Sequence, residues 1–313
     1  MFESLFDHRG LSLDRLRALL EVCDAGSIAE AAPGDPVRQS QYSRQLRELS
    51  EFFGVKVGRR QGKLLKLTAE GARLAELTRE QFRSLQDFRS ECRADSSDYA
   101  IAAGDSLLHW LIIPRLGTLI GGKRPVRFAT VNLRTHEIVQ QLSEGIIDFG
   151  IVRGDAVGSG LKTAPLGRLD YCAVAPASLV KGKKRPSLRE ILTHCPVAVQ
   201  TTDGQFSRRL REIAVSSEYA FRPALSCQSF PQTVSAVRSG FFAAILPKLA
   251  LKELPAKCYV LAEGGVLDQL QRELVLAWNP RIAGRRPGAM RLLEQMQKLF
   301  RLGSSLRRPT CAP

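Results

Sequence analysis

Residues 25–49 constrain the fold of this chain more than any other segment. Their sequence, AGSIAEAAPGDPVRQSQYSRQLREL, predicts two short helices joined by a turn. One face of the second helix is apolar, because large side chains recur there at three- and four-residue spacing: Tyr42, Leu46, Leu49 and Phe53. Arg, Gln and Ser side chains at the start of such a helix can hydrogen-bond base edges and phosphates in a major groove. Taken alone, these residues fit an ordinary solvated helix equally well.

The sequence on either side of this segment favours a DNA-binding module. An apolar stripe typical of a first helix precedes it: Leu13, Leu16, Leu19, Leu20 and Cys23. Two short alternating runs, residues 54–57 and 65–67, follow it and predict a hairpin with Gly58 and Gly62 at its bend. Residues 36–66 contain eight Lys or Arg against two Glu, so positive charge lies where a duplex backbone would run. Three helices and a basic hairpin predict a winged helix-turn-helix.

At these residues the chain resembles the LysR-type transcriptional regulators. In that family a Gly-Ser pair opens the second helix, an alanine-rich stretch follows, and Val-Ser-Gln-Pro-x-Leu-Ser-Arg-Gln begins the recognition helix. The matching residues, without a gap, are Gly26, Ser27, Ala31, Ala32, Val37, Gln39, Ser43, Arg44, Gln45 and Leu46. The family's wing and the start of its linker helix are matched by Leu49, Gly54, Val55, Leu67, Thr68 and Gly71. We expect double-stranded DNA to be contacted by Ser27, Arg38, Gln39, Ser40, Gln41, Ser43, Arg44, Arg47, Arg59, Arg60 and Lys63.

The chain departs from the family pattern at the turn between the two helices. Residues 33–36 are Pro-Gly-Asp-Pro where Glu-Arg-Leu is usual, and Asp35 replaces a core leucine. Arg38 replaces the small N-cap serine, and Ser40 replaces a proline. Proline cannot continue a helix, so we expect the second helix to stop near Ala32 and Asp35 to stay out of the core. The departures indicate either an altered operator specificity or a DNA-binding domain that has partly lost its function. The intact basic wing favours altered specificity.

The rest of the chain predicts a linker helix and an α/β module. Residues 69–95 carry an imperfect apolar stripe among many charges, and in the family this helix pairs with its copy in a second subunit. From Tyr99 onward strands and helices alternate, which predicts parallel sheets with right-handed crossovers. Residues 143–152 and 240–247 resemble two further family signatures, although Phe242 stands where glycine is usual. The resemblance therefore covers nearly the whole chain.

The expected fold class is α/β with an N-terminal all-α winged helix-turn-helix, a linker helix and a two-lobed effector domain like the periplasmic binding proteins. The expected boundaries are 1–68 for the DNA-binding domain, 69–95 for the linker and hinge, and 96–313 for the effector domain. Lobe I would comprise 98–170 and 266–303, and lobe II 171–265. The partners that follow are a small-molecule effector, a second copy in a homodimer or homotetramer, and RNA polymerase as a candidate.

The effector site is expected where parallel strands end. Ligands bind beyond the carboxyl ends of strands in open α/β sheets, where helix N-termini point N–H groups into a cleft. This rule selects Asp105, Ser106, Arg134, Thr135, Thr202, Gln205 and Phe230, although Ser and Thr there often only cap helices. Residues 96–313 carry 30 Lys or Arg against 16 Asp or Glu, and Arg134, Arg153, Arg208 and Arg209 lie near the expected cleft. We therefore expect an anion such as a small carboxylate or a phosphorylated metabolite, while much of the excess charge is typical of solvated loops.

Other classes of function find little support in the sequence. Four scattered histidines and the lack of a nucleophile elbow or phosphate loop argue against an enzyme, and no cofactor or metal site is expected. The seven cysteines have no metal-binding spacing, and Cys195 with Cys227 are the two that a redox role would need to bring together. Neither a signal peptide nor a membrane span is present in the sequence, so we expect a cytoplasmic location. A module that binds an effector and protein partners but has lost DNA contact is the alternative.

Overall fold

The computed structural model describes residues 3–5, 10–61, 64–92, 97–120, 126–180, 186–200, 205–216, 223–255, 258–284, 286 and 288–303. The chain divides into two compact units. One consists of residues 1–94 with 144–146, and the other of residues 95–143 with 147–313. No helix among the described residues is long and apolar enough to span a membrane.

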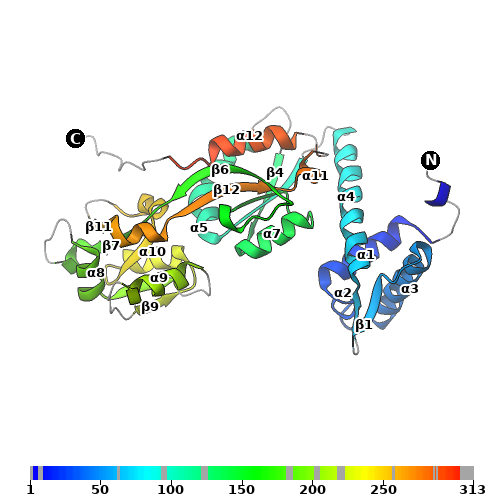
Figure 1. Ribbon diagram of the computed structural model, residues 1–313, viewed down its shortest axis with the longest axis horizontal. Coiled ribbons are helices and arrows are strands. Elements are labelled where there is room, and N and C mark those ends of the chain that lie inside the picture. The colour runs from blue at the N-terminus through cyan, green and yellow to red at the C-terminus, as the bar shows by residue number, and fades with distance from the viewer. Residues whose placement is uncertain are drawn as a thin grey trace. The chain divides into compact units, whose positions relative to one another are not determined.

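The first unit is a helical domain with a two-stranded hairpin (Figure 1). Its elements in order are α1 (Leu13–Ala25), α2 (Ile28–Ala31), α3 (Pro36–Phe53), β1 (Gly58–Gln61), β2 (Leu64–Leu67) and α4 (Ala69–Cys92). Most of the predicted stripes form its core, since Leu19, Tyr42, Leu46 and Leu49 are all at most 4% exposed, but Leu13 at the start of α1 is 63% exposed. Gly71 of α4 lies so close to the preceding turn that a Cβ there would be 2.0 Å from the Val57 carbonyl oxygen. The winged helix-turn-helix predicted from the sequence is therefore present.

The hairpin differs in detail from the predicted one. β1 and β2 pair antiparallel, with Gly58 opposite Leu67 and Gln61 opposite Leu64. Gly58 therefore begins a strand and is not at the bend, and Gly62 lies outside the described residues. The run 54–57 is not a strand, because Gly54 closes α3 in the left-handed conformation with φ +66°.

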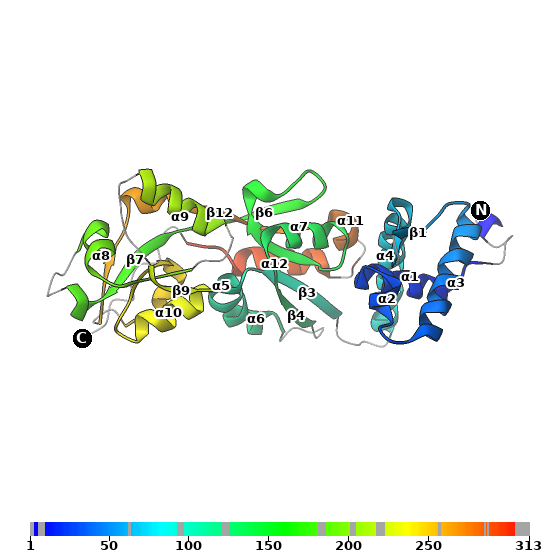
Figure 2. The ribbon, with the colours of Figure 1, turned by 90° about the horizontal axis from the view of Figure 1, so that it is seen from below.

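The second unit contains two five-stranded sheets, one in each of two neighbouring lobes (Figures 1 and 2). The first has the order β4-β3-β5-β12-β6, with bounds Val126–Asn132, Ser97–Ala103, Phe149–Arg153, Arg272–Trp278 and Lys162–Leu169. The second has the order β11-β7-β10-β8-β9, with bounds Tyr259–Ala262, Tyr171–Pro176, Ala243–Pro247, Val197–Gln200 and Pro223–Cys227. β3 pairs parallel with both β4 and β5, as the predicted βαβαβ series requires. The late strand β12 returns to the first sheet, as predicted, and pairs antiparallel with β5.

Helices cover both sheets. α7 (Thr135–Ser143) packs on β3 and β5, and on the other face α12 (Ala289–Leu299) packs on β6 and on α6 (Ile113–Ile120). α10 (Phe230–Arg238) packs on β7, β8 and β10. The remaining α-helices of this unit are α5 (Asp105–Leu107), α8 (Leu188–His194), α9 (Gln205–Ser216) and α11 (Pro280–Ala283). A capping box begins α8, where Ser187 and Glu190 bond reciprocally.

Two strands were not predicted from the sequence. β6 contains Pro165 and Gly167, residues that normally argue against a strand. Gly167 has φ +108°, and a register shift between Leu274 and Val275 of β12 lies opposite this irregular stretch. β11 is only four residues long, and all four are partly buried, so it shows no alternation.

Candidate functional site

The turn between α2 and α3 explains the unusual Pro-Gly-Asp-Pro sequence. α2 ends at Ala31, so the predicted early stop is confirmed. Asp35 is the N-cap of α3: its carboxylate accepts the backbone N–H of Arg38 at 3.0 Å, and Pro36 occupies the first turn of the helix. Asp35 is exposed, as expected. The expectation that Arg38 stands at the N-cap was wrong, because α3 begins one turn earlier and places Arg38 inside its first turn.

Arg38 interacts with α1 inside the domain. Its guanidinium lies 3.6 Å from the Glu21 carboxylate and 5.5 Å from the centre of the Tyr42 ring. The Tyr42 hydroxyl donates to the same carboxylate, and burial followed by this hydrogen bond raises the tyrosine pKa. Arg38 therefore helps to join α1 to α3, and its side chain remains 55% exposed.

Two other predicted DNA contacts also have internal roles. Ser27 is fully buried and caps α2 by accepting the Glu30 backbone N–H at 3.2 Å, so its side chain is not available to a duplex. Gln39 donates from its side-chain amide to the Ala32 carbonyl oxygen at 2.7 Å. Both side chains stabilise the short α2 and its turn.

The remaining predicted residues of α3 form an exposed polar surface: Ser40, Gln41, Ser43, Arg44 and Arg47. Arg44 lies 2.9 Å from Glu48, and hydrogen bonds from Arg44 and Arg15 lower the pKa of that carboxyl. Arg59 is exposed on β1. The side chain of Arg60 and the whole of Lys63 lie outside the described residues.

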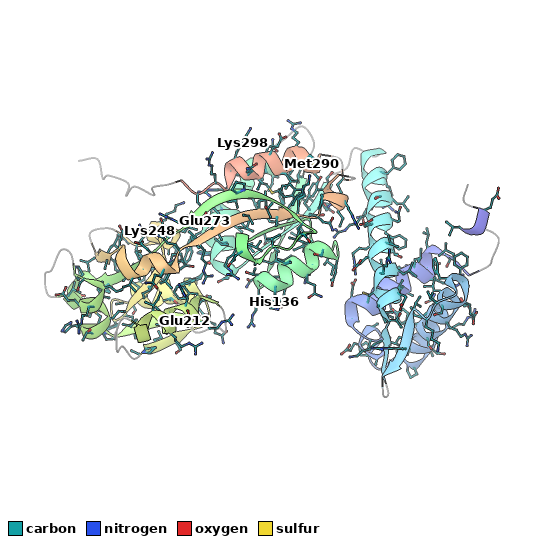
Figure 3. The ribbon with its side chains drawn as sticks, viewed as in Figure 1. His136, Glu212, Lys248, Glu273, Met290 and Lys298 are labelled. Atoms are coloured by element: carbon teal, nitrogen blue, oxygen red, sulfur yellow. The ribbon has the colours of Figure 1, made fainter. Side chains whose placement is uncertain are left out.

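The second unit contains a cavity of about 270 Å³ between elements of the two sheets. Arg153 comes from the end of β5, Arg209 from α9 and Arg272 from the start of β12. Figure 3 labels Glu273 of β12, which also lines the cavity, and Glu212 of α9, which lies 3.1 Å from Arg209. Arg153 likewise pairs with Asp155 at 3.0 Å. The cavity is thus polar, with three guanidinium groups around it.

Arg272 differs from the other two arginines. It has no carboxylate partner among the described residues, and its guanidinium lies 6.0 Å from the Tyr171 ring centre and 5.9 Å from that of Phe206. Burial raises the pKa of Tyr171, and the nearby Arg272 charge opposes that rise. A guanidinium stacked on rings still presents its N–H edge to an anion.

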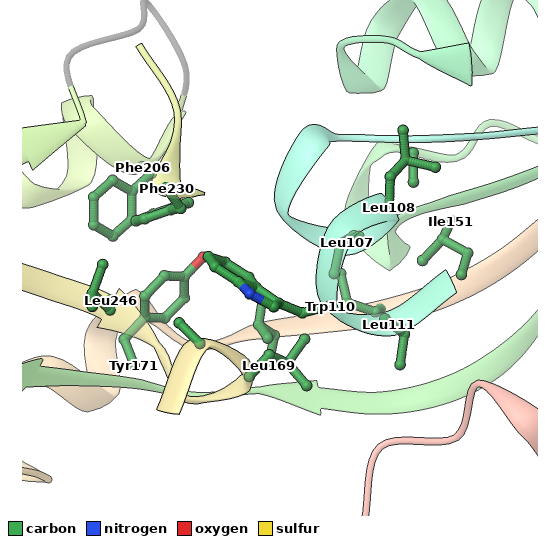
Figure 4. Close-up of a cluster of buried hydrophobic side chains, with 14 of the residues drawn as sticks. Leu107, Leu108, Trp110, Leu111, Ile151, Leu169, Tyr171, Phe206, Phe230 and Leu246 are labelled. Atoms are coloured by element: carbon green, nitrogen blue, oxygen red, sulfur yellow. The ribbon is translucent and has the colours of Figure 1, made fainter. Parts of the chain in front are cut away.

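The predicted effector residues are not among those that line this cavity. Asp105 and Ser106 start α5, which follows the Gly104 N-cap. α7 begins at Thr135, and Arg134 at its cap position has its backbone N–H bonded to Glu137 at 2.6 Å. Phe230 is buried against Phe206 and Tyr171, as Figure 4 shows. Thr202 and the Gln205 side chain lie outside the described residues.

The direction of β12 explains why sequence reasoning missed Arg272. The rule that ligands bind at the carboxyl ends of parallel strands does not select the start of β12, because β12 runs antiparallel to β5. Leu274 faces Arg153, so the amino end of β12 lies beside the carboxyl end of β5. An antiparallel return strand in an otherwise parallel sheet is the signal that would have found it.

The two sheets also meet through Glu253, at the end of the 3-10 helix η5 (Lys248–Glu253). Its carboxylate accepts a hydrogen bond from the Trp110 indole at 2.6 Å and lies 2.8 Å from the His109 imidazole. Burial raises the pKa of Glu253, but these two hydrogen bonds and the nearby positive charge together outweigh burial and lower the pKa. Trp110 belongs to a π-helical turn, η2 (Leu108–Ile112), and packs with Tyr171 in one continuous core (Figure 4).

The structure places Cys195 and Cys227 apart. Gln200 of β8 lies opposite Cys227 of β9, and Cys195 precedes Gln200 by five residues. Val197 and Gln200 at the two ends of β8 are about 10 Å apart, and Cys195 precedes Val197 at the C-cap of α8, whereas a disulfide needs Cα atoms within about 7 Å. Cys23, Cys172, Cys195, Cys227 and Cys258 are free, and no group of three or more potential metal-binding side chains occurs among the described residues.

Comparison with known proteins gives two family matches. Residues 13–72 match the bacterial regulatory helix-turn-helix protein, lysR family. Residues 94–301 match the LysR substrate binding domain. The two matches together cover both units of the chain.

Relatives and solved structures agree with these matches. A probable nitrogen assimilation transcriptional activator of Synechococcus elongatus is 26% identical over 256 residues, which cover 77% of this chain and 80% of that protein. A full-length OxyR variant from Pseudomonas aeruginosa has a TM-score of 0.63 at 18% identity, covering 96% of this chain and 100% of that one. LysG from Corynebacterium glutamicum, solved with bound effector arginine, has a TM-score of 0.60 at 15% identity and covers 93% and 100%. At these identities the structures establish similarity of fold.

Proposed function

Because the chain belongs to the LysR family of transcriptional regulators, we propose that its α3 surface and basic hairpin read a two-half-site operator, and that a small anion in the cavity changes this reading. The family assignment rests on the two matches, which span residues 13–72 and 94–301. The effector proposal rests on one observation about Arg272. Its guanidinium lines a cavity between the two lobes and has no carboxylate partner among the described residues.

The DNA contacts that we propose come from the exposed residues of the winged domain. Ser40, Gln41, Ser43, Arg44 and Arg47 project from α3, and Arg59 lies on β1. Arg60 and Lys63 remain proposals from the sequence. Arginines of this set would bind phosphates, and the uncharged side chains would reach base edges. Arg38 would reach a phosphate only in exchange for its interaction with Glu21.

Salt dependence and sequence preference test this proposal. We would select a duplex with the full-length protein from a randomised pool and measure its affinity by fluorescence anisotropy at several salt concentrations. We expect the logarithm of the affinity to fall with the logarithm of the salt concentration with a slope of about −4 or steeper, and a shuffled duplex to bind about 1,000-fold more weakly. Equal affinity for both duplexes would instead support the alternative, an effector-binding module with degenerate DNA reading.

The cavity favours an anion because of its arginines. Arg153 and Arg209 already have carboxylate partners two and three residues further along the chain, so Arg272 is the group that a carboxylate or phosphate would engage first. Arg–anion contacts are charge-assisted and bidentate, and they strengthen where water is excluded. Because Arg209 belongs to α9 and Arg272 to β12, a bound anion would join the two lobes.

A thermal-shift screen tests the effector proposal. We would compare small carboxylates and sugar phosphates with their uncharged amides and sugars on the full-length protein. An anion at about 100 times its dissociation constant should raise Tm by about 5 °C or more. Arg272→Gln should abolish this rise, while Arg189→Gln on the exposed face of α8 should not. A screen in which only neutral compounds stabilise the protein would overturn the proposal.

The mechanism that we propose is a shift between conformations of an oligomer. An effector changes the equilibrium only if it binds one relative orientation of the lobes better than the other. The Glu253 bridge to Trp110 and His109 is one contact between the lobes that such a change would alter. RNA polymerase remains a candidate partner for the output.

A further inference from the structure

We propose that Val37 reads the methyl group of a thymine in the major groove. The proposal deepens the operator reading proposed above and rests on it. It names a contact made by the additional first turn of α3, which exists because Asp35 caps the helix one turn before the expected start.

The position of Val37 on α3 is the first argument. Tyr42, Leu46 and Leu49 mark the buried face of this helix. Residues 37, 40, 41 and 44 follow the i, i+3, i+4, i+7 spacing of a single helical face, and that face lies opposite the buried one. Val37 therefore shares its surface with Ser40, Gln41 and Arg44, all of which are exposed. It is the member nearest the N-terminus, the end of a recognition helix that contacts base edges.

The exposure of Val37 is the second argument. Its side chain is 79% exposed, the highest fraction among the exposed large apolar side chains of the described residues. Valine is a poor helix former, so neither packing nor helix propensity accounts for it at this position. A single exposed apolar residue needs no explanation in general. Here, however, it lies on the face whose other members are polar and suited to DNA.

The engagement of its neighbours is the third argument. Arg38 is directed to Glu21 and Tyr42, and Gln39 to the Ala32 carbonyl oxygen. Pro36 begins the helix, and of the residues that follow it in the first turn of α3, Val37 is thus the one whose side chain is exposed without an internal contact. The apolar feature that base pairs offer in the major groove is the C5-methyl group of thymine, and small apolar side chains recognise it.

Replacing thymine by deoxyuridine tests the contact directly, because the two bases differ only by that methyl group. We would take the duplex selected by the full-length protein and replace its thymines one at a time, then measure affinity at fixed salt. We expect one position in each half-site at which the replacement weakens binding about fourfold, the value of one buried methyl group. Val37→Ala should weaken binding to the thymine duplex by a similar factor and should be insensitive to deoxyuridine at that position.

Val55→Ala is the matched control, since Val55 is also exposed in this domain but lies after the end of α3. It should keep the sensitivity to deoxyuridine. If no position is sensitive, or if Val37→Ala stays as sensitive as the natural protein, the thymine contact is overturned while operator reading stands. If the selection enriches no sequence, operator reading itself fails, and the thymine contact fails with it.

Discussion

Replacing Arg286 by alanine should lower the free energy of unfolding of the effector-binding unit by about 3–5 kcal/mol. Arg286 and Asp148 form an ion pair whose side chains are 8% and 5% exposed. The Arg286 guanidinium also lies 4.3 Å from the Tyr99 ring centre, and the other oxygen of Asp148 accepts the Ala100 backbone N–H at 2.7 Å. Without Arg286, the buried Asp148 carboxylate loses the guanidinium that pairs with it.

Urea unfolding of the full-length protein measures this loss. Both tryptophans of the chain, Trp110 and Trp278, lie in this unit, so their fluorescence reports on it alone. Arg127→Ala is the matched control: Arg127 pairs with Asp98 at 2.6 Å but is 70% exposed, and its loss should cost less than about 1 kcal/mol. If Arg286→Ala and Arg127→Ala lowered the free energy of unfolding equally, the importance of the buried ion pair would be contradicted. The Asp148→Asn/Arg286→Met variant removes both charges, so it should be at least as stable as Arg286→Ala alone, and a lower stability would also contradict the prediction.

This ion pair shows how far the sequence predicts the effector unit. The signature over residues 143–152 identified Asp148 as part of a family pattern, and the strand β5 (Phe149–Arg153) follows it directly. Its partner is 138 residues further along the chain. Hydrophobic periodicity carries no information about such a pairing, because it reports which face of an element is buried and not which distant element covers it. The antiparallel direction of β12, and with it the cavity at Arg272, was not predicted for the same reason, although the return of this strand to the first sheet was.

The turn before α3 shows the same limit at short range. The prolines correctly predicted the early end of α2, because their effect on the backbone is local. The new start of α3 was missed because Asp35 was considered as a replaced core leucine. An Asp followed by proline is also a strong helix start, with the carboxylate as cap and proline in the first turn. When α3 begins at Pro36, Arg38 is no longer the N-cap and Val37 lies on the exposed face of the helix.

Aspartate at both Leu85 and Phe88 should make the protein monomeric and weaken operator binding by about 100-fold or more. Leu77, Leu85 and Phe88 lie close together on one face of α4 and are 52%, 57% and 65% exposed, so this 24-residue helix carries an apolar strip that its own unit does not cover. A second copy of α4 is the partner that we propose for it. Two linked recognition helices gain roughly 100- to 10,000-fold over one, because the second half-site is bound within the same complex.

Sedimentation and operator titration measure the two halves of this prediction. The Leu85→Asp/Phe88→Asp variant should sediment as a monomer and bind a duplex with one half-site as tightly as the natural protein does. Gln86→Asp is the control: it adds one negative charge next to Leu85 but on the opposite side of the helix from the strip, and should leave both properties unchanged. All three substituted side chains are exposed within the subunit, so folding should be preserved. A double variant that remained dimeric would place the subunit interface elsewhere, and the apolar strip of α4 would then need another partner.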